Sequence, residues 1–358
     1  MIEKVMNIRF AAFVLSLSVF LGMLAANTVT PASDPAIRYM GRIHWDENGN
    51  GSFTFPGTSA LFKFKGTELA MATSPGSGKF IVEIDNGEPV TTVFTKTDSV
   101  MTLAENLTDT IHSAKIVYAI EGFAHHPQFR SFHTDGSILP DDSKNDIKIE
   151  FIGNSITCGY GIEDDDPKKG FSYDTENHTL SYAYKTAQAL NADFNVVARS
   201  GIGMYRNYGT AKEGSDKTMP LEYDYTLLYN HDHKWDFSRF TPDIVCINLG
   251  TNDMSVNNYD ISLYESHYRD FLHHLRELYP NAKIVLLTGA MLYGKELTLV
   301  KETLDRLAAE DSNTYRFDMS QQTGELGYGA NYHPSARQAQ RMADELIEFM
   351  QGLINQRD

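Results

Sequence analysis

The chain has 358 residues, of which 42% are hydrophobic, 22% charged and 11% aromatic, and its formal net charge is −16. A chain of this length usually exceeds one hydrophobic core, so we expect two domains. The negative charge excludes a nucleic-acid binder because it repels phosphate backbones, and the aromatic content excludes a largely disordered chain. Two cysteines are too few for a disulfide scaffold or a cysteine-based zinc site.

The N-terminal residues have the features of an export signal. Two basic residues precede an apolar run over residues 10–24, and two alanines follow it. This order is typical of a signal peptide, and the run is shorter than the ~20 apolar residues that a membrane-spanning helix needs. We therefore predict a signal peptide over residues 1–26 rather than an anchor, and a secreted or periplasmic protein with no stable membrane insertion. There we expect Cys158 and Cys246 to stay unpaired, because Cys246 lies in a predicted buried strand.

Residues 35–136 have the pattern of an all-β domain. The expected strands are Ser59–Lys65, Lys79–Asp85, Val90–Thr95 and Ala114–Ala119. Asp85-Asn86-Gly87 predicts a tight hairpin between two of them, because both turn positions need a positive φ. Short strands at this spacing predict a β-sandwich of jelly-roll type. The Pro- and Asp-rich residues 137–146 predict a linker after it.

Residues 147–354 alternate between strand and helix. The expected buried strands are Asp146–Gly153, Phe194–Ser200, Asp243–Gly250, Lys283–Gly289 and Thr314–Phe317. The expected helices are Ser181–Asn191, Asp260–Leu278, Lys295–Ala308 and Pro334–Gly352. Asp260 is a predicted helix cap, and Pro334 a predicted first helical residue. This alternation predicts a flavodoxin-like α/β domain with a parallel sheet, in which ligands bind at the carboxyl ends of the strands.

Candidate functional residues lie at those strand ends. The first strand ends in Gly153-Asn154-Ser155, where the serine is either an exposed nucleophile or an ordinary helix cap. The second ends near Gly201 and Gly203, which permit either a close backbone approach to a ligand or a plain tight turn.

Two more candidates follow along the chain. Asn252 follows the third strand, where its amide either donates to an oxyanion or forms an Asx-turn. His333 precedes the last helix and is able to reach the first strand end, although a single surface histidine is often incidental.

A serine, a glycine, an asparagine and a histidine thus follow one another at the ends of successive elements. This order resembles the four sequence blocks of the SGNH (GDSL-type) hydrolase superfamily, which carry Ser, Gly, Asn and His. The resemblance implies that Ser155 is the nucleophile and that His333 is the general base and then the general acid. It also implies an oxyanion hole made by the amides of Ser155 and Gly203 and the side chain of Asn252. Gly203 is favoured over Gly201 when the end of the strand at Val196-Val197 is aligned with the superfamily pattern.

Further motifs narrow the resemblance. Asn154 stands where the superfamily usually has Asp, residues 153–161 read GNSITCGYG, and residues 55–57 read FPG. Together they resemble carbohydrate esterase family 2 across residues 37–350. The resemblance implies a secreted serine esterase that removes O-acetyl groups from plant polysaccharides such as xylan and glucomannan, often at the 6-position. It implies an acetyl-serine intermediate, an acetylated polysaccharide or oligosaccharide as partner, and no metal or organic cofactor.

One residue departs from the superfamily pattern. The Asp that normally lies three residues before the histidine is replaced by Ala330, with Asn331 after it. Losing this carboxylate costs a triad enzyme about 10⁴-fold in kcat. We therefore predict a Ser-His dyad in which the backbone carbonyl of Ala330 or Asn331 orients the imidazole, as the family resemblance implies for some members.

Four tyrosines beside these blocks are candidates for stacking on sugar rings, with packing as the alternative. They are Tyr160, Tyr205, Tyr208 and Tyr332. The histidine pairs of the chain lack carboxylate or cysteine partners at ligand spacing, so we predict no metal site. Two other functions stay open: an SGNH esterase acting on a wall O-acetyl group or a lipid ester, and an inactive carbohydrate-binding protein.

Overall fold

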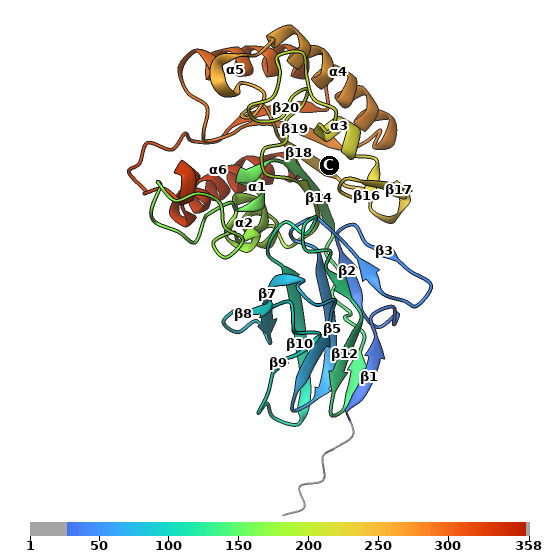
Figure 1. Ribbon diagram of the computed structural model, residues 1–358. Coiled ribbons are helices and arrows are strands. Elements are labelled where there is room, and N and C mark those ends of the chain that lie inside the picture. The colour runs from blue at the N-terminus through green and yellow to red at the C-terminus, as the bar shows by residue number, and fades with distance from the viewer. Residues whose placement is uncertain (1–26, 356–358) are drawn as a thin grey trace, which may run out of the picture.

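The structure is a computed structural model that describes residues 27–355 (Figure 1). The predicted signal peptide lies outside the described residues. Within the described part of the chain, no helix is long and apolar enough to cross a membrane. The chain forms an N-terminal β-sandwich and a C-terminal α/β half, as predicted.

Between residues 27 and 139, the N-terminal half contains thirteen short strands. They are β1 (Thr28–Pro31), β2 (Arg38–Met40), β3 (His44–Trp45), β4 (Gly51–Ser52), β5 (Ser59–Gly66), β6 (Leu69–Ala72), β7 (Gly78–Ile84), β8 (Val90–Phe94), β9 (Val100–Ala104), β10 (Thr110–Tyr118), β11 (Gln128–Phe129), β12 (Ser131–Thr134) and β13 (Ser137–Leu139). One sheet has the order β1-β12-β6-β9, a second has β13-β5-β10-β7-β8 with β2 beside β5, and a third has β11-β4-β3. All pairings within these sheets are antiparallel.

Alternating side chains make the core of the sandwich. Along β5, Phe62 and Phe64 are buried while the lysines beside them point outward. The predicted hairpin joins β7 to β8, with Asp85 and Asn86 both at positive φ.

The predicted linker is partly wrong. Residues 137–139 form strand β13, which pairs with β5, so the sandwich extends into the segment that we expected to be irregular. The cause is the exposed edge of β5, which gives this segment backbone hydrogen-bond partners that a composition argument does not reveal.

The C-terminal half is built on five parallel strands in the order β15-β14-β18-β19-β20, which is the flavodoxin-like order. They are β14 (Ile147–Gly153), β15 (Ala192–Ala198), β18 (Ile244–Asn248), β19 (Lys283–Thr288) and β20 (Thr314–Asp318), and a separate hairpin is made of β16 (Tyr225–Leu227) and β17 (Asn230–Lys234). The α-helices are α1 (Ser155–Cys158), α2 (Tyr182–Ala189), α3 (Met219–Glu222), α4 (Ile261–Leu278), α5 (Gly294–Ala308) and α6 (Ala336–Ile354). Short 3₁₀ helices are η1 (His178–Leu180), η2 (Phe237–Arg239), η3 (Ser255–Asn257) and η4 (Ala330–Tyr332).

Helices cover both faces of the parallel sheet. Figure 1 shows α4 and α5 on one side and α2 and α6 on the other, and each pair packs into its own hydrophobic cluster. The cap prediction at Asp260 is confirmed, because its carboxylate accepts from the amides of Ser262 and Leu263. The start of the last helix is wrong by two residues. Ser335 caps α6 and Pro334 precedes it, because the Ser335 hydroxyl accepts from the amide of Gln338.

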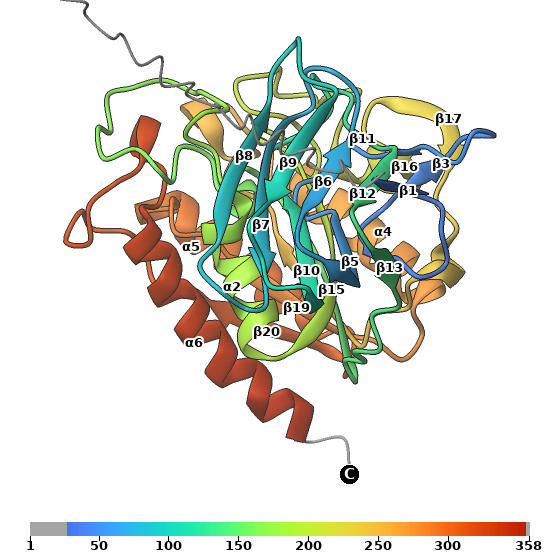
Figure 2. The ribbon, with the colours of Figure 1, turned by 90° about the horizontal axis from the view of Figure 1, so that it is seen from below.

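The two halves share a buried interface, and Figure 2 shows the sandwich strands in front of the α/β half. Phe55, from the FPG motif, is fully buried within the cluster that also contains α4 and α5. Gly57 has a φ of +79°, and a Cβ there would lie 2.9 Å from the His178 ring. Arg42 is also fully buried and reaches Glu150 on β14 at 3.3 Å. These contacts hold the sandwich against the α/β half.

Candidate active site

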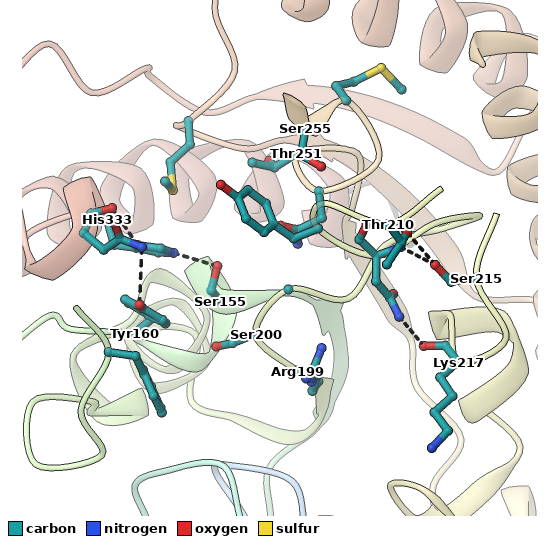
Figure 3. A pocket seen from close by; sticks show the side chains of 18 of the residues that line it. Ser155, Tyr160, Arg199, Ser200, Thr210, Ser215, Lys217, Thr251, Ser255 and His333 are labelled. Carbon is teal, nitrogen blue, oxygen red and sulfur yellow. Dashed lines mark hydrogen bonds between the residues drawn. The ribbon is translucent and has the colours of Figure 1, made fainter. Parts of the chain in front are cut away.

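A cleft of about 1490 Å³ lies at the carboxyl ends of the parallel strands. Ser155, Asn252 and His333 line it together with residues 199–201, which follow β15. Figure 3 shows Ser155 and His333 facing each other inside it. The structure thus brings together three of the four residues that the superfamily resemblance implies.

The turn after β14 presents Ser155. Asn154 caps α1, because its side chain accepts from the amide of Ile156 at 3.0 Å, and Ser155 is therefore the first residue of the helix. The helix lasts four residues and ends at Gly159, whose φ is +81°. A Cβ at Gly153 would lie 2.0 Å from the Thr157 hydroxyl, so only glycine fits there. The motif is a compact strand-to-helix turn around one hydroxyl.

His333 directly follows η4 and lies against Ser155. Its Nε2 lies 2.8 Å from Ser155 Oγ, and its Nδ1 lies 3.2 Å from the backbone carbonyl oxygen of Asn331. Ala330 is fully buried, and its methyl group lies so close to Gly161 that a Cβ on Gly161 would be 2.5 Å from it. The position where the superfamily has an acid is therefore a packing position here, and a carbonyl accepts from the imidazole instead.

Several contacts hold that carbonyl in place. Asn331 and Tyr332 have φ values of 51° and 57°, a left-handed conformation that costs free energy in residues other than glycine. Hydrogen bonds hold this turn: Asn331 donates its amide to the Lys169 carbonyl at 2.8 Å, and Gln322 donates to the Tyr332 carbonyl at 2.6 Å. The orienting acceptor is therefore built into the backbone.

Burial sets the protonation of the imidazole. His333 is 8% exposed, and desolvation lowers its pKa to about 4, against the opposing effect of the carbonyls of Asn331 and Ala330. Tyr160 stacks on the ring with centroids 3.9 Å apart. At neutral pH the imidazole is therefore unprotonated and able to accept the proton of Ser155.

The oxyanion-hole prediction needs one correction. The amide of Gly203 donates to Asn207 Oδ1 at 3.1 Å, and Gly203 does not line the cleft. It is glycine because a Cβ there would lie 2.8 Å from the Asp253 carboxylate. Gly201 lines the cleft instead, with a φ of +79°. Asn252 lies there as predicted and donates one amide hydrogen to the Ile202 carbonyl at 2.8 Å, which leaves its second hydrogen for a ligand.

The four candidate tyrosines separate into two pairs. Tyr160 and Tyr208 line the cleft. Tyr205 is 1% exposed, and its hydroxyl accepts from the amide of Asp260, so it belongs to the core. Tyr332 is half exposed but lies outside the cleft-lining residues. Sequence proximity to a motif thus did not separate packing from cleft residues.

Other cleft residues have no motif in the sequence. Glu121 and Phe123 come from the sandwich, and a loop over residues 207–217 forms part of the wall. Arg199 lies over the rings of Phe123 and Tyr229, each at 5.6 Å. Because they come from distant segments, only the three-dimensional structure reveals their association.

One group of possible metal ligands occurs among residues 27–355. Glu121, Cys158 and Glu176 are buried and place one ligand atom each within 4.8 Å of one another. Glu121 Oε1 already accepts from the backbone amide of Ser200 at 2.7 Å. Cys158 and Cys246 are both buried and unpaired, as predicted.

Comparisons with known proteins agree with this architecture. Residues 39–141 match the family model described as Carbohydrate esterase 2 N-terminal, and residues 151–346 match the GDSL-like Lipase/Acylhydrolase family. The chain is 33% identical to Cellulase/esterase CelE of Acetivibrio thermocellus over 90% of its own length, and it spans 40% of the length of that relative. It is 29% identical to an acetylxylan esterase / glucomannan deacetylase of Cellvibrio japonicus, over 98% of this chain and all of that one.

A solved structure of a carbohydrate esterase also superposes on this chain. The family two carbohydrate esterase from Clostridium thermocellum, solved in complex with cellohexaose, superposes with a TM-score of 0.84 at 32% identity. The match covers 89% of this chain and 99% of that one, so it includes both halves. The chain therefore belongs to carbohydrate esterase family 2, a family of carboxylic ester hydrolases.

Proposed function

We propose that this protein is an exported esterase that removes O-acetyl groups from plant polysaccharides such as xylan and glucomannan, with a preference for primary 6-positions, through an acetyl ester of Ser155. The observation that carries the proposal is the 2.8 Å contact between Ser155 Oγ and His333 Nε2 in an open cleft. The acetylxylan esterase / glucomannan deacetylase of Cellvibrio japonicus supports the substrate class, and the signal-like residues 1–26 support the export.

The first half-reaction acylates the enzyme. Ser155 Oγ attacks the acetyl carbonyl carbon while His333 Nε2 takes the hydroxyl proton. The negative charge on the carbonyl oxygen is held by the amides of Ser155 and Gly201 and by the free amide hydrogen of Asn252. The carbon–oxygen bond to the sugar then breaks, and the sugar oxygen leaves with the proton from His333.

The second half-reaction returns the free enzyme. A water molecule gives a proton to His333 and attacks the acetyl carbon of the acyl-enzyme, and the same three donors hold the oxyanion. Collapse releases acetic acid and returns the proton to Ser155 Oγ. The Asn331 carbonyl accepts from Nδ1 throughout, which keeps Nε2 directed at the serine. A carbonyl supplies geometry but no full negative charge to the imidazolium.

The cleft has room for more than an acetyl group. Its volume of about 1490 Å³ exceeds the size of a typical small-molecule site, which is about 300–1,000 Å³. Aromatic rings of Tyr160, Tyr208 and Tyr293 line it beside polar groups such as Lys217. Such a surface suits a neutral sugar chain, which stacks on rings and accepts hydrogen bonds.

Acetate release tests the proposal. The wild-type protein and the Ser155→Ala variant are incubated with acetylated glucomannan, acetylated xylan, O-acetylated bacterial wall, a long-chain lipid ester and an aryl acetate. We expect the wild type to release acetate from the plant polymers and the aryl acetate, and Ser155→Ala to release it about 10⁴- to 10⁶-fold more slowly.

Two outcomes contradict the proposal. Preferential hydrolysis of the wall or lipid ester would leave the serine esterase in place but replace its substrate class. A folded wild-type protein that releases nothing yet binds the polymers would make it a carbohydrate-binding protein.

A further inference from the structure

Glu121 reaches from the sandwich to the loop that follows β15. It lies three residues after β10, is 2% exposed, and lines the cleft. Its Oε1 accepts from the backbone amide of Ser200 at 2.7 Å. A hydrogen bond of this length to a buried carboxylate is among the stronger contacts in proteins.

The residue that Glu121 holds lies directly beside an oxyanion donor. Ser200 precedes Gly201, and both line the cleft with Ser155, as Figure 3 shows for the two serines. Gly201 has a positive φ, so the orientation of its amide depends on how the loop is fixed at each side. On the far side, Asp253 accepts from the amides of Met204 and Tyr205, at 2.8 Å each. Glu121 makes the corresponding contact on the near side.

We propose that Glu121 is a positioning residue for ester hydrolysis: the sandwich, through this carboxylate, orients the Ser200–Gly201 backbone of the oxyanion hole. This inference rests on the proposed function. It gives the N-terminal half a direct part in the chemistry, beyond shaping the cleft.

The surroundings of Glu121 restrict its movement. Its own amide donates to Glu176 Oε2 at 3.3 Å, and Glu176 is fully buried. Burial and the neighbouring Glu121 raise the pKa of Glu176 well above its usual range, which favours the neutral form of Glu176 and lowers the repulsion between the two carboxyl groups. Lys79 Nζ donates to the Glu176 carbonyl at 3.0 Å and pairs with Glu163 at 2.7 Å. The carboxylate is therefore held on a rigid support.

Three substitutions and one control test the role. Glu121→Ala removes the acceptor, Glu121→Asp withdraws it by one methylene, and Glu121→Gln keeps a carbonyl oxygen for the Ser200 amide. Arg38→Ala is the matched control. Arg38 lies on β2 and pairs at 2.8 Å with Asp193, near the start of β15. The substitution therefore removes a contact between the sandwich and the end of β15 that lies opposite to Ser200. Thermal unfolding checks that each variant is folded.

Two readouts are used, hydrolysis of an aryl acetate and the rate at which an aryl phosphonate ester modifies Ser155. We expect Glu121→Ala to lower kcat and the phosphonylation rate about 10- to 100-fold, with KM unchanged, because displaced oxyanion donors act on the transition state. Glu121→Asp is expected to lie between Ala and wild type, whereas Glu121→Gln and Arg38→Ala stay near wild type. If Glu121→Ala does not fold, Glu121→Asp carries the same test.

Three results overturn the proposal. One is a wild-type kcat in Glu121→Asp or Glu121→Ala. Another is a rise in KM alone, which would make Glu121 a sugar contact. The third is a Glu121→Gln variant as slow as Glu121→Ala. Because neither probe is a polysaccharide, a wrong assignment of the natural substrate leaves this test intact and is detected separately by the acetate-release panel.

Discussion

Replacing Ser155 or His333 with alanine is expected to lower kcat about 10⁴- to 10⁶-fold, with the Ser155→Ala/His333→Ala double variant no slower than either single variant. In the proposed mechanism, the two side chains act as one proton-transfer unit through their 2.8 Å contact. Without His333, Ser155 has no base to accept its proton, and without Ser155, His333 has no nucleophile to activate. The residual rate then comes from substrate binding and the oxyanion donors, which all three variants keep.

Aryl acetate hydrolysis measures this prediction, with His112→Ala as the control. His112 is also a buried histidine, but it lies in the sandwich and pairs with Asp85 at 2.6 Å. Its loss is expected to leave kcat near wild type. Multiplicative losses in the double variant would contradict a dyad that acts as a unit.

The pH profile gives a second readout of the same dyad. Desolvation lowers the pKa of His333 to about 4, and the base form is the unprotonated one. Activity is therefore present above this pKa and falls as the pH drops through about 4. An acid limb of kcat/KM near the ordinary histidine value of about 6.5 would contradict the buried, carbonyl-oriented imidazole.

The largest expected loss of stability comes from Arg42→Ala. Arg42 is fully buried at the interface between the halves, where it donates to the carbonyls of Tyr223 and Tyr225 and to Glu150 Oε1. Its guanidinium also lies over the Tyr223 ring at 4.6 Å. Removing the guanidinium leaves a buried carboxylate and two backbone carbonyls without their hydrogen-bond donor. We therefore expect a cost of about 3–5 kcal/mol in the free energy of unfolding.

Denaturant unfolding measures that cost, and Arg38→Ala again provides the control. Arg38 also joins the two halves by an ion pair, but it is a quarter exposed, so its loss is expected to cost less than about 1 kcal/mol. In an Arg42→Ala/Glu150→Leu double variant, which has no uncompensated charge, part of the stability is expected to return. Equal losses for Arg42→Ala and Arg38→Ala would show that burial of the Arg42 network contributes nothing.

Local patterns predicted most of the architecture. The five buried apolar runs become β14, β15, β18, β19 and β20, because strands covered on both faces need continuous apolar side chains. Ser155, Asn252 and His333 were also predictable, since each follows a strand or precedes a helix at the same edge of the sheet. The choice of Gly203 failed because both glycines are compatible with a tight turn. Only the structure shows that the Gly203 amide is used by Asn207.

Residues from the other half of the chain could not be predicted. Glu121 is separated from Ser200 by 79 positions, and their contact depends on how the sandwich docks onto the sheet. Arg42 likewise meets Glu150 from 108 positions away. A charged residue in a strand-rich segment does not by itself predict an interface contact, because the residue that it pairs with lies far away in the sequence. The loop over residues 207–217, which forms part of the cleft wall, has no motif of its own, and only Tyr208 within it was a candidate from the sequence.

The central claim is that Ser155, activated by His333 without a carboxylate, carries the acetyl group. Trapping the acyl-enzyme tests it most directly: the protein is mixed with an aryl acetate, quenched with acid before steady state, and its peptides are analysed by mass spectrometry. We predict an acetyl group on Ser155 in the wild type and none at this position in Ser155→Ala, which releases acetate about 10⁴- to 10⁶-fold more slowly. Undiminished acetate release by Ser155→Ala, or an acetyl group carried on another side chain, would contradict the account.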